Sequence, residues 1–120
     1  MAGTTTLELP REAGSAGIAR LIVTAHGAGL PSDRLRNANL MVSELVTNAF
    51  KHGSGRIELC VSSDGDGVSA SVHDEGVGHT IASPEPRPDR GGWGLMFVDR
   101  LADGWGVDDD ASKVWFRVAA

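Results

Sequence analysis

The chain has 120 residues, of which 41% are hydrophobic and 22% charged, an ordinary composition for one globular domain. Asp and Glu number 16 against 11 Lys and Arg, and the formal net charge of -5 has the wrong sign for non-specific binding to a polyphosphate backbone. Length and charge therefore exclude a pair of large domains and predict no direct contact with nucleic acid.

The cysteine content and the start of the chain indicate a reducing compartment. Cys60 is the only cysteine, so no internal disulfide can form. Residues 1–6 lack a basic stretch followed by an apolar one, and no apolar run reaches the roughly 18 residues of a membrane span. We expect a cytoplasmic protein that does not enter a membrane.

The first half of the chain predicts one strand and two helices. Residues 4–9 alternate and are rich in β-forming residues up to Pro10, which predicts a short edge strand. Apolar residues at helical spacing predict a first helix over residues 15–26. A longer helix follows, with an N-cap in residues 31–33 and an end at Gly53, which can adopt the left-handed cap conformation.

Residues 57–90 predict a hairpin followed by a long loop. Apolar and polar residues alternate over 57–62 and 68–72, on either side of a glycine-rich turn, which predicts a β-hairpin. Residues 76–90 contain three prolines and little apolar periodicity. This pattern indicates a long loop, and loops of this length in compact domains are often functional.

A short helix and two strands are predicted to close the chain. The helix covers residues 95–102 and begins after the glycine pair at 91–92, and the strands cover 105–107 and 114–118. With the earlier elements, this order predicts one α+β domain over residues 1–120. We expect a two-layer sandwich whose mostly antiparallel sheet is covered on one face by about three helices.

Polar residues gather on one face of the long helix. Glu44, Asn48 and His52 are spaced four residues apart, with Lys51 beside them, so the first three share a face. A carboxylate and an amide one turn apart can hold a hydrated Mg²⁺ ion or orient an attacking hydroxyl group. A solvated polar stripe without function is the alternative, and the spacing alone leaves both open.

Two glycine-containing turns could admit a ligand. Asp74 ends a predicted strand and is followed by Gly76 and Gly78, so a flat ligand could approach while the carboxylate accepts a hydrogen bond from an exocyclic amine. The alternative is a turn in which Asp74 bonds its own backbone. Residues 90–95 contain three glycines at a helix start, where free amide groups attract phosphates; a plain hinge is the alternative there.

The three motifs, in this order, resemble a known family. Residues 44–48, 74–78 and 92–95 resemble the N, G1 and G2 boxes of the histidine kinase-like (GHKL) ATPases. Residues 43–52 and the tryptophan-containing last two strands are similar to the bacterial anti-sigma-factor serine kinase branch of that family. The resemblance covers roughly residues 7–118 and implies a Bergerat-type ATP-binding fold.

The resemblance implies a site for ATP and Mg²⁺ beneath a lid made of residues 78–90. Asn48 would bind Mg²⁺, and Asp74 would accept a hydrogen bond from the adenine amino group. Glu44 would be the catalytic base that takes a proton from a serine or threonine hydroxyl, and Arg90 would steady the transferring phosphoryl group. Further nucleotide contacts would come from Lys51, His52, Gly76, Gly78, Gly91, Gly92, Gly94, Leu95 and Ser112.

The function that the resemblance implies is that of an ATP-dependent serine/threonine protein kinase acting as an anti-sigma factor. Such a protein sequesters a sigma factor, phosphorylates an anti-sigma factor antagonist and, as is frequent in this branch, forms a homodimer. Residues 111–113 depart from the family, because Ala-Ser-Lys stands where a Gly-Thr pair usually precedes the last strand. Ser112 could supply the hydroxyl of that pair.

This departure leaves alternatives open. The first is a non-catalytic module that binds a partner and carries a degenerate nucleotide site. The second is a catalytic domain detached from a histidine kinase, which is disfavoured because no pair of phosphoacceptor helices precedes the first predicted strand.

Overall fold

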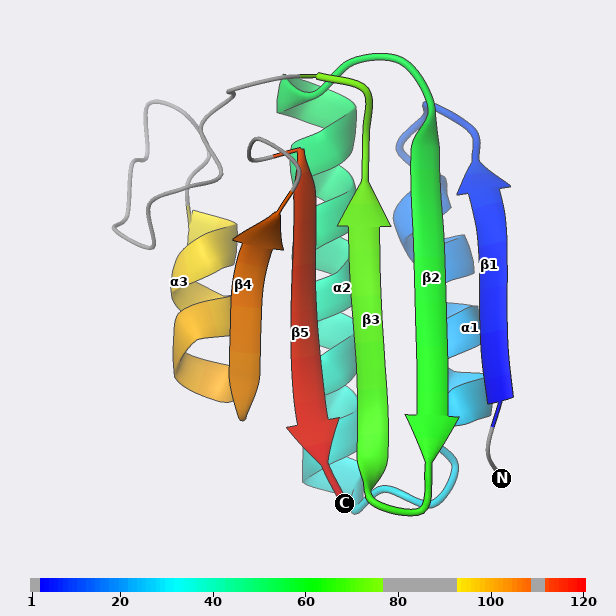
Figure 1. Cartoon of the computed structure of the whole chain (residues 1–120), viewed down its shortest axis with the longest axis vertical. Coiled ribbons are helices and arrows are strands. Elements are labelled where there is room, and N and C mark those ends of the chain that lie inside the picture. The colour runs from blue at the N-terminus through cyan, green and yellow to red at the C-terminus, as the bar shows by residue number, and fades with distance from the viewer. Residues whose placement is uncertain (1–2, 77–92, 109–111) are drawn as a thin grey trace.

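The computed structural model describes residues 3–76, 93–108 and 112–120, with the backbone alone for Trp93 and Gly94. These ranges contain three helices and five strands, which Figure 1 shows. In chain order they are β1 (Gly3–Leu9), α1 (Ser15–His26), α2 (Ser32–His52), β2 (Ile57–Asp64), β3 (Gly67–His73), α3 (Trp93–Leu101), β4 (Gly104–Asp108) and β5 (Lys113–Ala119). Each predicted helix and strand is present within a few residues of its predicted bounds.

The described strands form one sheet in the order β1-β2-β3-β5-β4, and every neighbouring pair is antiparallel. Figure 1 shows α1, α2 and α3 together on one side of this sheet, with β1 and β4 at its edges. This arrangement confirms the predicted α+β sandwich, with one layer of helices and one of strands. Within the described ranges, none of the helices has the length and hydropathy of a membrane span.

The hydrophobic core lies between the sheet and the helices, with α2 at its centre. Strand alternation directs every second residue toward the helices, and Val61, Ala70 and Phe116 form one such cross-strand row, all buried. α2 meets the sheet with a buried apolar stripe made of Ala38, Met41, Val42, Leu45, Val46 and Ala49. Because burying a large apolar side chain contributes about 1.5–3 kcal/mol, this stripe fixes which face of α2 points away from the sheet.

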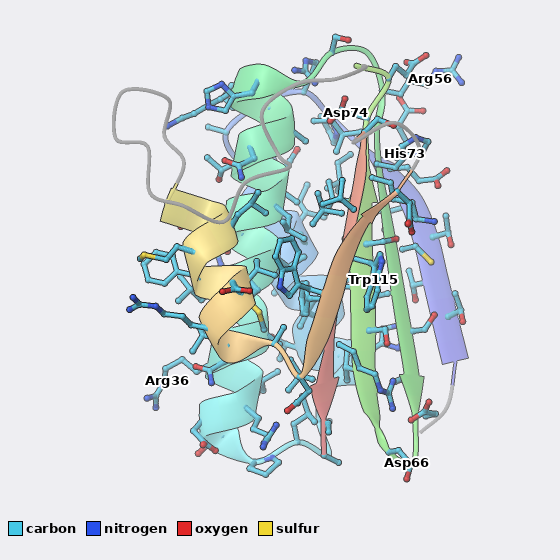
Figure 2. All side chains as sticks on the ribbon, turned by 60° about the vertical axis from the view of Figure 1, so that its left-hand side comes forward. Arg36, Arg56, Asp66, His73, Asp74 and Trp115 are labelled. Atoms are coloured by element: carbon cyan, nitrogen blue, oxygen red, sulfur yellow. The ribbon has the colours of Figure 1, made fainter. Side chains whose placement is uncertain are left out.

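The face of the sheet without helices carries mostly small polar side chains. Thr6, Cys60, Ser71 and Trp115 form one cross-strand row there. Trp115, labelled in Figure 2, is half-buried and lies against Gly106, where an added Cβ would be 2.7 Å from the indole nitrogen. The tryptophan therefore covers β4 on the outer face, while between the layers Phe116 is fully buried and Phe50 and Trp105 pack against the core.

Both ends of α2 lie where the sequence predicts them, but the structures of their caps differ from the prediction. Pro31 is the N-cap residue, and no side-chain hydrogen bond caps the helix start; Asp33 instead places a negative charge in the first turn, where the helix dipole favours it. At the other end Gly53 is extended, with φ -86° and ψ -169°, so the predicted left-handed cap is wrong. Glycine is needed there for space, because an added Cβ would come within 2.5 Å of the Asp74 Cγ atom.

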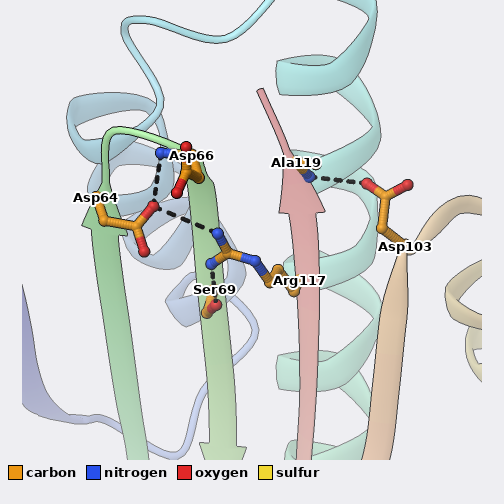
Figure 3. Close-up of polar contacts among 6 residues, drawn as sticks. All are labelled: Asp64, Asp66, Ser69, Asp103, Arg117 and Ala119. Carbon is orange, nitrogen blue, oxygen red and sulfur yellow. Dashed lines mark hydrogen bonds and ion pairs between the residues drawn. The ribbon is translucent and has the colours of Figure 1, made fainter.

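Asp103 ties the end of β5 to the chain just before β4, as Figure 3 shows. Its Oδ2 atom accepts a hydrogen bond from the backbone N–H of Ala119 at 2.7 Å and another from Arg34 at 2.8 Å. The hydrogen bond from the Ala119 N–H is the largest effect on the pKa of Asp103, and it holds this pKa below its usual range. The positive charge of Arg34 acts in the same direction, whereas desolvation opposes both. Asp103 therefore stabilises the fold in its ionised form.

Asp64 has a similar role at the hairpin turn. Its Oδ1 atom accepts hydrogen bonds from the backbone N–H of Asp66 at 2.7 Å and from Arg117 at 3.3 Å, and these two bonds lower the pKa of Asp64. Arg117 also donates to Ser69 at 3.1 Å. One arginine thus connects β2, β3 and β5 at the end of the sheet opposite to Asp74 (Figures 2 and 3).

We expect the substitution Asp103→Asn to remove part of the acid dependence of stability. Because the folded pKa of Asp103 is lowered, its contribution is complete above the unfolded pKa of about 3.9 and is lost as the pH falls through the lower folded value. The variant should melt about 2–5 °C below the wild type at neutral pH, since an exposed pair contributes up to about 1 kcal/mol. Thermal melts followed by circular dichroism, from neutral to strongly acidic pH, should show this difference in melting temperature disappearing. A difference that stays constant with pH would contradict the stabilising role of ionised Asp103.

Candidate functional site

The C-terminal end of α2, the turn that follows it and the end of β3 meet at one end of the sandwich. Figure 1 shows these segments together, and Figure 2 labels Asp74 among them. The backbone N–H of Asp74 donates to the carbonyl of Ser112 at 3.0 Å, and that of Glu75 donates to the carbonyl of Ser54 at 2.8 Å. The structure therefore brings Asp74 next to both Ser112 and the end of α2.

The polar face of α2 borders the core. Glu44, Asn48 and His52 are half-buried, whereas their neighbours Leu45 and Ala49 are core residues. The Nε2 atom of His52 is buried and has no hydrogen-bond partner among the described residues. Because an unpaired buried polar atom costs about 1–3 kcal/mol, this nitrogen indicates a position for a ligand or a water molecule beside α2.

Asp74 is a buried carboxylate, 3% exposed, at the end of β3. Its Oδ1 atom accepts a hydrogen bond from the backbone N–H of Gly76 at 2.7 Å, so the self-bonded turn considered as an alternative is present. Its Oδ2 atom packs against Gly53, where an added Cβ would overlap it. A carboxylate has about four acceptor positions, so this turn and a hydrogen bond from a ligand are compatible.

The turn between α2 and β2 is held against the residues that follow β3. Gly55 has a positive φ of 68°, which favours glycine, and an added Cβ would lie 2.7 Å from the Cβ of Glu75. The backbone N–H of Arg56 donates to the Glu75 carboxylate at 2.5 Å. Two glycines, Gly53 and Gly55, therefore allow this turn to approach the chain around Asp74 closely.

Arg11 is a residue near the site that the sequence did not reveal. It lies between β1 and α1, and its Nη2 atom donates to the carbonyls of Ala49, Phe50 and Gly53 at 2.8, 2.9 and 2.7 Å. Basic residues are expected near helix C-termini, but usually from the last turn of the same helix. Because Arg11 comes from a segment far away in the chain, no spacing rule could have linked it to α2.

Some of the remaining predicted site residues are described by the structure, and others lie outside the described residues. Lys51 is exposed at the end of α2, and Leu95 is a core residue, 2% exposed, in α3. A nucleotide contact at Leu95 would therefore use its backbone, as at Gly94, which lies in the first turn of the same helix. The other predicted contacts, together with the lid, lie outside the described residues: Gly78, Arg90, Gly91 and Gly92.

Comparisons with known proteins identify the family. Residues 9–118 match the model of the histidine kinase-like ATPase domain. The chain therefore belongs to the histidine kinase-like ATPase domain family, which confirms the resemblance seen in the three motifs. Within it, the chain is similar to the anti-sigma F factors of Geobacillus stearothermophilus and Geobacillus kaustophilus strain HTA426. Each is 30% identical over 110 residues, and each alignment covers 79% of this chain and 75% of the relative.

We expect Gly53→Ala to destabilise the protein by about 1–3 kcal/mol, because the new Cβ would overlap the Asp74 carboxylate and the Ala49 carbonyl. Urea unfolding followed by tryptophan fluorescence measures the loss. Gly65→Ala is the matched control, since a Cβ at that position meets nothing within 4 Å. Equal stability of the two variants would show that the contact with Asp74 does not require glycine at position 53.

Proposed function

We propose that this protein is an ATP- and Mg²⁺-dependent serine/threonine protein kinase that acts as an anti-sigma factor. It sequesters a sigma factor and phosphorylates an antagonist protein of that interaction. The proposal is supported by family membership and by similarity to two anti-sigma F factors. The structural observation that carries it is the buried Asp74 carboxylate, packed on the end of the helix that bears Glu44, Asn48 and His52.

The side chains around Asp74 fit a nucleotide. Asp74 offers a buried acceptor for the exocyclic amine of adenine, and the buried Nε2 atom of His52 needs a hydrogen-bond partner such as a ribose hydroxyl or a phosphate. Lys51 precedes His52 at the same end of the helix and adds positive charge near the phosphates. Ser112 is buried, and its carbonyl accepts the N–H of Asp74. In this proposal its hydroxyl replaces that of the family's Gly-Thr pair, so that the nucleotide site is retained rather than degenerate.

Bound ATP and Mg²⁺ supply the phosphoryl group and the neutralisation of its charge, so the protein mainly has to position the reactants. Asn48 offers one oxygen ligand, which suits Mg²⁺ because this ion usually keeps several waters and shares its remaining positions with phosphates. Glu44, one turn earlier on the same face, accepts the proton of the partner's hydroxyl group. Gly76, Gly78, Arg90, Gly91, Gly92, Gly94 and Leu95 complete the proposed site.

The same proposal includes the cellular setting. A protein with these partners acts in the cytoplasm, without direct contact with nucleic acid or membrane. Among the described strands, β1 lies at an edge of the sheet, and it offers a surface through which a homodimer could form.

We expect Glu44→Gln to lower phosphoryl transfer by about 10²–10⁴-fold while leaving ATP affinity unchanged, because the amide cannot accept the proton. The assay is transfer of labelled phosphate from ATP to a purified antagonist protein, with Glu58→Gln, an exposed change on β2, as the matched control. Full transfer by the Glu44 variant would refute its role. Tight ATP binding by the wild type without any transfer would refute the kinase and favour a non-catalytic anti-sigma factor.

We also expect ATP with Mg²⁺ to raise the melting temperature of the wild type, and Asn48→Ala to remove the Mg²⁺-dependent part of that increase. Ligand at about 100 times its Kd stabilises a protein by about 2.7 kcal/mol, which is a readily measured shift. Scanning calorimetry with ATP, with and without EDTA, tests both statements. Wild-type protein whose melting temperature is indifferent to ATP would support the alternative of a partner-binding module with a degenerate site.

A further inference from the structure

The guanidinium group of Arg11 covers the C-terminal end of α2. Its Nη2 atom lies within hydrogen-bond distance of three carbonyls, those of Ala49, Phe50 and Gly53, and its Nη1 atom donates to the carbonyl of Gly55 at 3.4 Å. These carbonyls belong to the last turn of the helix and to the turn that follows. A single side chain therefore contacts both the last turn of α2 and the turn that follows it.

The end of α2 needs such a partner. The last carbonyls of a helix have no hydrogen-bond donor within the helix, and this end carries a partial negative charge. A left-handed glycine often lets the following N–H groups satisfy these carbonyls, but Gly53 is extended, and among the described backbone bonds its own N–H is the one that returns, to the Ala49 carbonyl at 3.1 Å. Arg11 supplies donors to the carbonyls of Phe50 and Gly53, a second donor to that of Ala49, and a positive charge.

The backbone around Arg11 is itself held in place. The N–H of Glu12 donates to the carbonyl of Pro10 at 2.9 Å, and the N–H of Ser15 donates to the carbonyl of Glu12 at 3.1 Å. The hydroxyl of Ser15, a fully buried residue, donates to the carbonyl of Pro10. Arg11 therefore extends from an ordered turn at the start of α1, and it links that turn to the end of α2.

The segment that Arg11 holds is also the segment that borders Asp74. Gly53 packs directly on the Asp74 carboxylate, and the carbonyl of Ser54 accepts the N–H of Glu75. His52, whose buried Nε2 atom has no hydrogen-bond partner among the described residues, is the last residue of α2. A shift of this helix end would therefore move His52 and the packing surface of Asp74 together.

We propose that Arg11 is a positioning residue for the nucleotide site: by binding the carbonyls at the end of α2, it holds His52 and Gly53 in register with Asp74. It touches neither the nucleotide nor the reacting atoms in this proposal. The inference rests on the proposed function, because it assigns to Arg11 an effect on ATP affinity. The underlying contact with the helix end can be tested without any nucleotide.

The experiment compares Arg11→Ala and Arg11→Lys with Arg117→Ala in the full chain. Arg117 is a matched control because it also bridges segments through side-chain hydrogen bonds, but at the end of the sheet opposite to Asp74. Calorimetric titration with ATP and Mg²⁺ measures Kd, and amide hydrogen exchange monitors Gly53 and Glu75, whose N–H groups bond within the held segment. Thermal melts of all three variants measure global stability.

We expect Arg11→Ala to weaken ATP binding on the order of tenfold and to speed exchange at Gly53 and Glu75. Arg11→Lys should restore a large part of the affinity, since an ammonium group can still bind several carbonyls. Arg117→Ala should leave ATP affinity unchanged even where it lowers the melting temperature as much. This pattern separates positioning from general stabilisation.

Several results would overturn the inference. One is unchanged ATP affinity in Arg11→Ala despite faster exchange, which would reduce Arg11 to a structural cap. Another is an equal loss of affinity in Arg117→Ala, which would make the effect a consequence of stability alone. If the wild type binds no ATP, the proposed function fails. Amide exchange at Gly53 and Glu75 then still tests whether Arg11 holds the end of α2, and unchanged exchange in Arg11→Ala would refute that role.

Discussion

The close contact between Gly53 and Asp74 is the constraint on which the site depends. α2 carries the polar residues and β3 ends in the buried carboxylate, and the two can meet only because residue 53 has no side chain. The contact lies where the helix layer and the sheet come together at one end of the sandwich. The position of α2 against the sheet therefore sets the distance from Asp74 to the residues at the end of the helix.

The packing of α2 explains how that position is maintained. Its apolar stripe is buried against the sheet, so the helix cannot rotate without exposing the stripe to water. Glu44, Asn48 and His52 are consequently held at the border of the core, half-buried and on one side. A kinase of the proposed kind gains its rate mainly from such positioning, because phosphoryl transfer requires few covalent steps from the protein.

Local sequence patterns predicted the elements well, because each depends on short-range periodicity. The alternation in β2 and β3 and the three- and four-residue spacing in α2 reflect burial on one side only, and the structure confirms both. The end of α2 was predicted less well. Glycine after a helix usually indicates a left-handed cap, whereas Gly53 leaves space for Asp74, a residue that lies on another element.

The sequence by itself determined the α+β class, the helix face of Glu44, Asn48 and His52, and the family, since these depend on spacing and on motifs that are each contiguous in the chain. Only the tertiary structure decided the pairing of Asp74 with Gly53 and Ser112, and the role of Arg11 at the end of α2. The physical reason is that these contacts join segments far apart in the chain. Their geometry is set by how the two layers pack, which no local pattern encodes.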